Sequence, residues 1–186
     1  RDRYIDSSIL SSQQKKELFS IILNHYLRVP AYIYWRAPIL KLMQECYTSN
    51  CSSDLKPFVE HVKQFNKIQL ANICVILEVI VEEDKLDKDL YDYWTYAADN
   101  LIQKDDEEKK LAALNLYKAL KAWDNLTRLS KEYNTFSQKL KERYYEVIGN
   151  GKISNKDVVD CWVNGCFESN PYAINAVLCI EAPSTI

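Results

Sequence analysis

The stretch that decides the fold class is DEEKKLAALNLYKALKAWDNLTRLSKEYNTFSQKLKERYYEV, residues 106–147, which contains neither glycine nor proline. It lies within a longer run, residues 58–148, that lacks both residues as well. The whole chain of 186 residues has 3 glycines and 5 prolines. Because glycine and proline are the usual turn residues, a hairpin-rich β architecture is disfavoured. The sequence predicts an all-α fold.

Apolar residues in this stretch recur every three or four positions, which is the spacing of one helix face. A single helix over 106–147 would be about 60 Å long, more than a compact domain of this size can hold. We therefore expect a break near Asn125 or Asn134. The predicted seam consists of Leu126, Leu129, Tyr133, Phe136, Leu140, Tyr144 and Val147.

Further helices are expected on both sides of this stretch. IQLANICVILEVIV, residues 68–81, is the most apolar segment and is predicted to be a central buried helix. Ser12 is the expected N-cap of a helix to about Leu27, and Ser53 or Asp54 that of a later one. Pro38 is expected to split 31–47 into two pieces. Other helices are predicted over 90–103 and after a capping box at Ser154 and Asp157, and a last short element is expected over 171–180.

No linker, repeat or low-complexity segment divides the sequence. We expect a single helical domain over 1–186, an irregular bundle of about six to eight helices, with 1–10 and 181–186 extended or frayed. The unbroken apolar run from Ile73 to Leu77 is far too short to span a bilayer, and no membrane span is predicted.

Six cysteines predict a disulfide-stabilised fold: Cys46, Cys51, Cys74, Cys161, Cys166 and Cys179. Two pairs share a C-x4-C spacing, whereas CxxC, the usual zinc or redox motif, is absent. Residues five apart on one intact helix point about 140° away from each other. Each pair therefore either closes a local loop or bonds to a distant partner. The alternative is six buried thiols in a reducing compartment.

The even number of cysteines favours a secreted, extracellular protein. The sequence begins with Arg1, as expected after removal of a signal peptide. N-glycosylation sequons occur at Asn50 and Asn125, the latter within a predicted helix. The Lys-, Asn- and Tyr-rich composition is similar to that of secreted effectors of invertebrate saliva or venom.

Several classes of chemistry lack their sequence motifs. The 24 Lys and Arg residues against 26 Asp and Glu argue against a nucleic-acid partner. GxGxxG, Walker and GxSxG motifs are absent, and the two histidines form no metal-binding motif. The carboxylates of 82–84 and 105–108 are interleaved with lysines, which is typical of a solvated surface. We predict no catalytic residues, no metal and no cofactor.

Two aromatic clusters are the candidate binding residues, because tyrosine and tryptophan are favoured at interfaces and in ligand sites. The ordinary role of such residues in a small helical protein is in the core. The four aromatic residues of 91–96 cannot all face one core, so some are expected at a surface or pocket. The clusters are Tyr91, Tyr93, Trp94 and Tyr96, and Tyr32, Tyr34, Trp35 and Arg36.

Together these features predict a secreted, non-enzymatic helical protein that binds an extracellular protein or a small apolar ligand. Binding could use an internal aromatic pocket or a flat aromatic patch. The alternative is an intracellular scaffold that resembles a helical repeat and carries free thiols.

Overall fold

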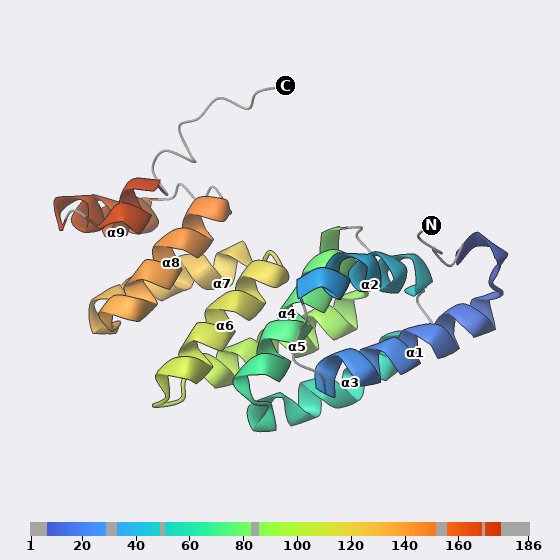
Figure 1. Cartoon of the computed structure of the whole chain (residues 1–186). Coiled ribbons are helices and arrows are strands. Elements are labelled where there is room, and N and C mark those ends of the chain that lie inside the picture. Colours follow the sequence, from blue (N-terminus) through green and yellow to red (C-terminus); the bar gives the residue numbers. More distant parts are fainter. Residues whose placement is uncertain are drawn as a thin grey trace. The chain divides into compact units, whose positions relative to one another are not determined.

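The computed structural model describes residues 7–28, 33–48, 51–82, 86–151, 156–168 and 170–175. Within these ranges the chain forms helices, turns and no strand, so the predicted all-α class is confirmed (Figure 1). The chain divides into two compact units, Arg1–Ala97 and Ala98–Ile186, which are described separately. The single domain expected over 1–186 stays a prediction.

Unit 1 contains four complete helices and most of a fifth. A short 3-10 turn, Ser7–Ile9, precedes them, and another, Val62–Gln64, follows α3. The fifth helix continues into unit 2. The helices are α1 (Ser12–Arg28), α2 (Ile33–Cys46), α3 (Ser52–His61), α4 (Lys67–Glu82) and α5 (Lys88–Ile102).

Helix α4 supplies much of the core of unit 1. It packs against α1 and α2, which also pack against each other. Ile73, Ile76, Leu77 and Ile80 are almost completely buried, which confirms the buried helix predicted over 68–81. Burying side chains of this size stabilises the fold by about 1.5–3 kcal/mol each relative to exposure.

Unit 2 holds the stretch that decided the fold class. It forms α6 (Glu107–Ala119), α7 (Trp123–Arg128), a 3-10 segment (Leu129–Thr135) and α8 (Gln138–Asn150), followed by α9 (Lys156–Phe167). Residues 171–175 are also helical. All seven residues of the predicted seam are buried. The described ranges thus contain ten α-helical segments, α1–α9 and 171–175, above the expected six to eight.

The predicted boundaries are partly confirmed and partly corrected. The α-helical pattern of 106–147 is interrupted at 120–122 and again over 129–137, where a 3-10 segment containing Asn134 precedes α8, so the break expected near Asn125 or Asn134 is found near Asn134. Helix α3 begins at Ser52 after Cys51, so neither Ser53 nor Asp54 is its N-cap. Helix α2 runs through Pro38 unbroken. Proline removes one backbone hydrogen bond and costs about 3 kcal/mol in a helix interior, which the packing of α2 on α1 and α4 offsets.

Polar side chains fix where most helices begin. Ser11, rather than the expected Ser12, caps α1: its hydroxyl accepts from the Gln14 amide, and the Gln14 side chain accepts from the Ser11 amide. Asn66 and Gln69 form the same reciprocal pair at α4. Single side-chain caps begin α5, α6, α8 and helix 171–175, from Asp87, Asp106, Ser137 and Asn170 respectively. Ser154 lies outside the described residues.

The expected disulfides are not found among the described cysteines. No disulfide joins any two of Cys46, Cys51, Cys74, Cys161 and Cys166, and Cys179 lies outside the described residues. Cys161 and Cys166 both lie within α9, where their side chains diverge by about 140°. Cys51 Sγ lies 3.8 Å from the carbonyl oxygen of Cys46 in a buried turn. The predicted disulfide stabilisation therefore lacks structural support.

An aromatic cluster fills the core of unit 2. The hydroxyl groups of Tyr133 and Tyr145 contact each other, and Tyr144 donates to the Leu126 carbonyl at 2.8 Å. Burial raises the pKa of Tyr133 to about 12 and raises that of Tyr144 as well. Gly165 of α9 lies directly on this cluster, because a Cβ there would come within 2.6 Å of Tyr145. Any larger residue would force the two apart.

The end of α6 places a lysine in an unusual backbone conformation. Lys121 has φ 53°, in the left-handed region. Its amide donates to the Lys118 carbonyl at 3.0 Å, and the Ala122 amide donates to the Tyr117 carbonyl at 2.9 Å. This pair of bonds is a Schellman motif, whose left-handed position is usually glycine.

We expect Lys121→Gly to stabilise the protein by about 1 kcal/mol, because glycine adopts the left-handed conformation without a Cβ penalty. Urea unfolding would measure the change. Lys118→Gly is the matched control, because it places glycine inside α6 and should destabilise by about 1 kcal/mol. A loss of stability in Lys121→Gly would contradict the assigned motif.

Candidate functional site

The four aromatic residues of the first predicted cluster lie on different faces of α5, some buried and some exposed. Trp94 is completely buried, and Tyr91 is partly buried. Tyr93 and Tyr96 are 46% and 67% exposed. The structure thus places Trp94 in the core and leaves Tyr93 and Tyr96 as the aromatic residues of α5 that a partner could contact at the surface.

The exposed face of α5 combines the two tyrosines with two carboxylates. Asp89, Asp92, Tyr93 and Tyr96 are all exposed. At 100° per residue they fall within an arc of about 100°, and the stripe extends about 10 Å along the axis. We call these four residues the α5 stripe. Tyrosine offers apolar area with a polar tip, and carboxylates attract cations, so this surface suits contact with another molecule.

Lys56 of α3 lies over the α5 stripe. Its ammonium nitrogen is 5.1 Å from the centroid of the Tyr93 ring, which is a cation–π contact. Within the described part of the chain, neither Asp89 nor Asp92 forms an ion pair. The carboxylates therefore remain available to a cation from outside the chain.

The second predicted cluster falls largely outside the described structure. Tyr32 is not among the described residues. Tyr34, Trp35 and Arg36 belong to α2, but their side chains lie outside what is described. Their proposed binding role stays a prediction.

A second exposed apolar surface was missed by the sequence analysis. Phe167 is 84% exposed at the end of α9, and Val163 is exposed one turn earlier. Tyr172 and Ile174 of the following helical segment are exposed too. The i, i+4 spacing of Val163 and Phe167 was visible in the sequence, but the direction of that face was set by Gly165 packing on Tyr145 and Ala173.

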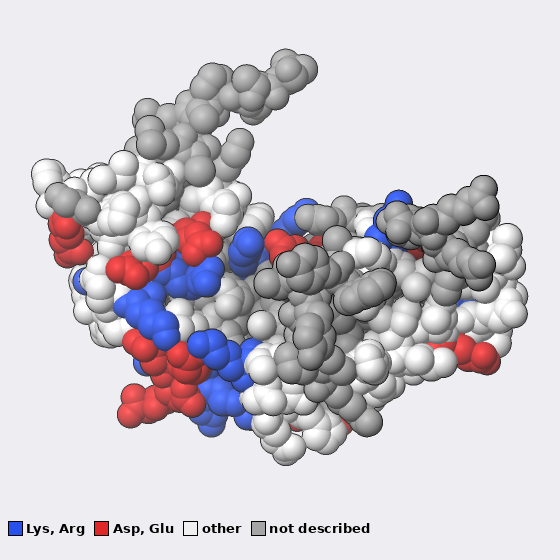
Figure 2. All heavy atoms as spheres, viewed as in Figure 1, with Lys and Arg blue, Asp and Glu red and all other residues white. Residues whose placement is uncertain are grey.

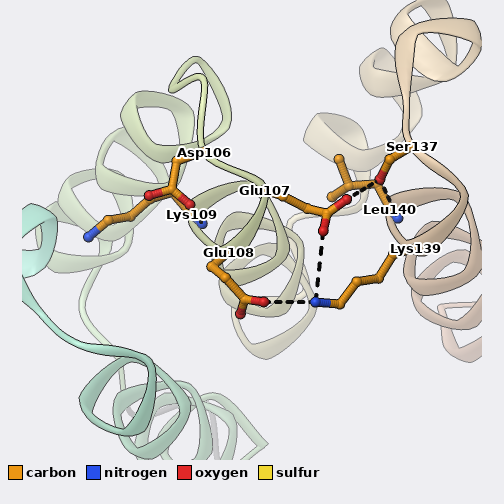
Figure 3. A network of polar contacts seen from close by, with 7 residues as sticks. All are labelled: Asp106, Glu107, Glu108, Lys109, Ser137, Lys139 and Leu140. Atoms are coloured by element: carbon orange, nitrogen blue, oxygen red, sulfur yellow. Dashed lines mark hydrogen bonds and ion pairs between the residues drawn. The ribbon is translucent and has the colours of Figure 1, made fainter.

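The acidic residues at the start of α6 form ion pairs and a hydrogen bond with residues at the start of α8 (Figure 3). Lys139 Nζ lies 2.7 Å from a Glu108 oxygen and 3.9 Å from a Glu107 oxygen. The Ser137 hydroxyl donates to the Glu107 carboxylate and accepts from the Leu140 amide. The hydrogen bond with Glu108 raises the pKa of the Lys139 ammonium.

This network is structural in character. Its ion-pair partners are about half exposed, and exposed pairs contribute little stability. Figure 2 shows acidic and basic side chains side by side on this face, with neither sign dominating. A paired, solvated carboxylate lacks the apolar surroundings that tune a catalytic acid.

Asn125 lies within α7 and belongs to a partly buried hydrogen-bond network. Its side-chain nitrogen, the atom to which an N-glycan would attach, donates to Asp99 Oδ1 at 3.2 Å. The Tyr117 hydroxyl donates to the same oxygen at 2.6 Å. Burial and this bond raise the pKa of Tyr117. The folded structure therefore does not favour a glycan at Asn125, and Asn50 lies outside the described residues.

Cys46 and His61 are two described residues of the types that serve as nucleophiles or metal ligands. Burial raises the pKa of the Cys46 thiol, which disfavours the reactive thiolate. His61 Nδ1 donates to the Pro57 carbonyl at 2.7 Å within its own helix. Among the described side chains, no group of three His, Cys, Asp or Glu residues could share a metal ion. No described helix has the length and apolar character needed to cross a bilayer.

Comparison with known proteins identifies no relative of this chain. No protein-family model matches the sequence, and no curated protein or solved structure is significantly similar to it.

The contribution of buried Trp94 to the stability of the fold can be tested by substitution. Its indole Nε1 is buried and has no hydrogen-bond partner within the described structure. We expect Trp94→Ala to cost about 3–5 kcal/mol, as for other large core deletions. Trp94→Phe should cost only about 1 kcal/mol, because it leaves a smaller cavity and removes an unsatisfied donor worth about 1–3 kcal/mol.

Chemical denaturation would measure both Trp94 variants against Tyr96→Ala. That exposed control should change stability by no more than about 0.5 kcal/mol. Equal losses in the two Trp94 variants would contradict the prediction that phenylalanine is favoured by its smaller cavity and by removal of the unsatisfied donor.

Proposed function

We propose that this protein is a non-enzymatic helical interaction protein that contacts a protein partner through the α5 stripe. The observation that carries the proposal is the 46% and 67% exposure of Tyr93 and Tyr96, one helical turn apart on one face. Tyrosine combines a large apolar area with a polar tip and is enriched in interface hot spots. The flat patch is thus better supported than the internal pocket.

The rigidity of the stripe supports the same proposal. Asp87 caps α5 by accepting from the Leu90 amide at 2.9 Å, and Trp94 anchors the opposite face in the core. Side chains held on a fixed helix lose less conformational entropy on binding than side chains on a loop. A small apolar ligand, the other predicted partner, finds less support because Trp94 packs within the core.

The test is site-specific photo-crosslinking in extract or fluid from the natural source. With a photo-reactive residue replacing Lys88, which is exposed at the start of α5 beside the stripe, we expect a defined partner to be captured, and its affinity is then measured with purified partner. Tyr93→Ala combined with Tyr96→Ala should weaken that affinity at least tenfold, because two interface tyrosines are lost.

The matched control is Phe167→Ala, which removes an exposed aromatic residue from the other unit. It should leave the affinity unchanged. If Phe167→Ala abolishes binding and the double tyrosine variant does not, the α9 surface carries the function and the proposal is wrong. Far-ultraviolet circular dichroism should be the same for all variants.

The location of the protein is a separate question. Secretion and an extracellular partner were predicted largely from cysteine pairing, and the described cysteines form no disulfide with one another. This observation favours the alternative of an intracellular helical scaffold with free thiols, in which the same stripe binds an intracellular protein.

Alkylation decides between the two locations. For natural-source protein denatured without reductant, we expect the mass to rise by six alkyl groups, one for each cysteine. No added groups would mean three disulfides, would contradict the scaffold alternative and would restore the prediction of secretion. A reduced sample, which must gain all six groups, is the control.

A further inference from the structure

We infer that the α5 stripe binds a basic segment of its partner, with arginine or lysine side chains placed between the tyrosines and the aspartates. This inference rests on the proposed function and names the partner's chemistry. Three features carry it: exposed aromatic rings, two carboxylates that form no ion pair with any described residue, and a cation–π contact already formed at Tyr93.

The carboxylates give the surface its selectivity. Asp89 and Asp92 are exposed and lie on the same arc of α5 as the tyrosines. A guanidinium group binds a carboxylate through two hydrogen bonds and stacks on an aromatic face, so both kinds of residue in the stripe serve one ligand group. An acidic segment would face two like charges without compensation, which opposes its binding.

The position of Lys56 indicates where a cation of the partner would bind on the stripe. Its ammonium lies 5.1 Å from the Tyr93 ring centroid, so that ring accepts a positive charge within this structure. An arriving guanidinium would compete with Lys56 for the ring and be repelled by its charge. The intramolecular contact therefore occupies the position that a basic partner would take.

This competition predicts that a substitution at the surface can increase the affinity for a basic segment. Removing the charge of Lys56 should strengthen binding of a basic segment, because it frees the Tyr93 ring and removes a like charge. Removing the charges of Asp89 and Asp92 should weaken it. A surface that recognises only apolar area would respond to neither change.

The probe is a fluorescently labelled amphipathic Arg–Leu peptide, with a Glu–Leu peptide of the same length as its control. Fluorescence anisotropy should show binding of the Arg–Leu peptide alone, and weaker binding as salt is raised. Lys56→Gln should tighten binding roughly twofold, and Asp89→Asn with Asp92→Asn should weaken it about fivefold, as expected for two exposed ion pairs. Glu142→Gln, an exchange on α8, should have no effect.

Three results would overturn the inference: equal binding of both peptides, no binding of either, or weaker binding after Lys56→Gln. None of these affects the crosslinking experiment. If the captured partner still requires Tyr93 and Tyr96 while the two aspartates are dispensable, the proposed function holds and the basic partner is wrong.

Discussion

The structure depends on side-chain capping at the start of its helices. Six helical segments in the described chain begin with a Ser, Asn or Asp whose side chain accepts from a backbone amide two or three residues later. Such a cap contributes about 1 kcal/mol relative to alanine. In a sequence with 3 glycines, these caps fix where the helices begin without any special backbone conformation.

Capping also positions the candidate surface. The cap at Asp87 fixes the start of α5, and the burial of Trp94 fixes its rotation about its axis. Together they determine that Tyr93, Tyr96 and the two aspartates face outward. The surface thus follows from core packing, and the aromatic residues of α5 divide between stability and binding.

In the second unit, close packing determines which residues of α9 are exposed, although no sequence motif marks them. Gly165 approaches Tyr145 so closely that a Cβ would not fit. This contact orients α9 and leaves Phe167 facing outward. The aromatic cluster beneath it carries tyrosine hydroxyls whose pKa values are raised by burial, which keeps them neutral in the core. No sequence motif marks this arrangement.

The periodicity of apolar residues was enough to predict the all-α class, the buried α4 helix and the seam from Leu126 to Val147, because each depends on local spacing. The break expected near Asn134 was found, whereas the one at 120–122 was missed, because the left-handed residue that ends α6 is Lys121 and not the glycine that usually marks such an end. Continuity through Pro38 depends on the neighbours of α2.

The candidate site was only half visible in the sequence. Four clustered aromatic residues indicated that some must be exposed, because helix geometry forbids a shared face. Which ones are exposed depended on the direction of the core, and therefore on residues distant along the chain. The cysteine pattern was misleading for a similar reason: two cysteines with C-x4-C spacing can bond to each other only across a loop, and α9 places Cys161 and Cys166 on an intact helix. Local spacing determined which segments are helical, whereas long-range packing decided which faces those helices present.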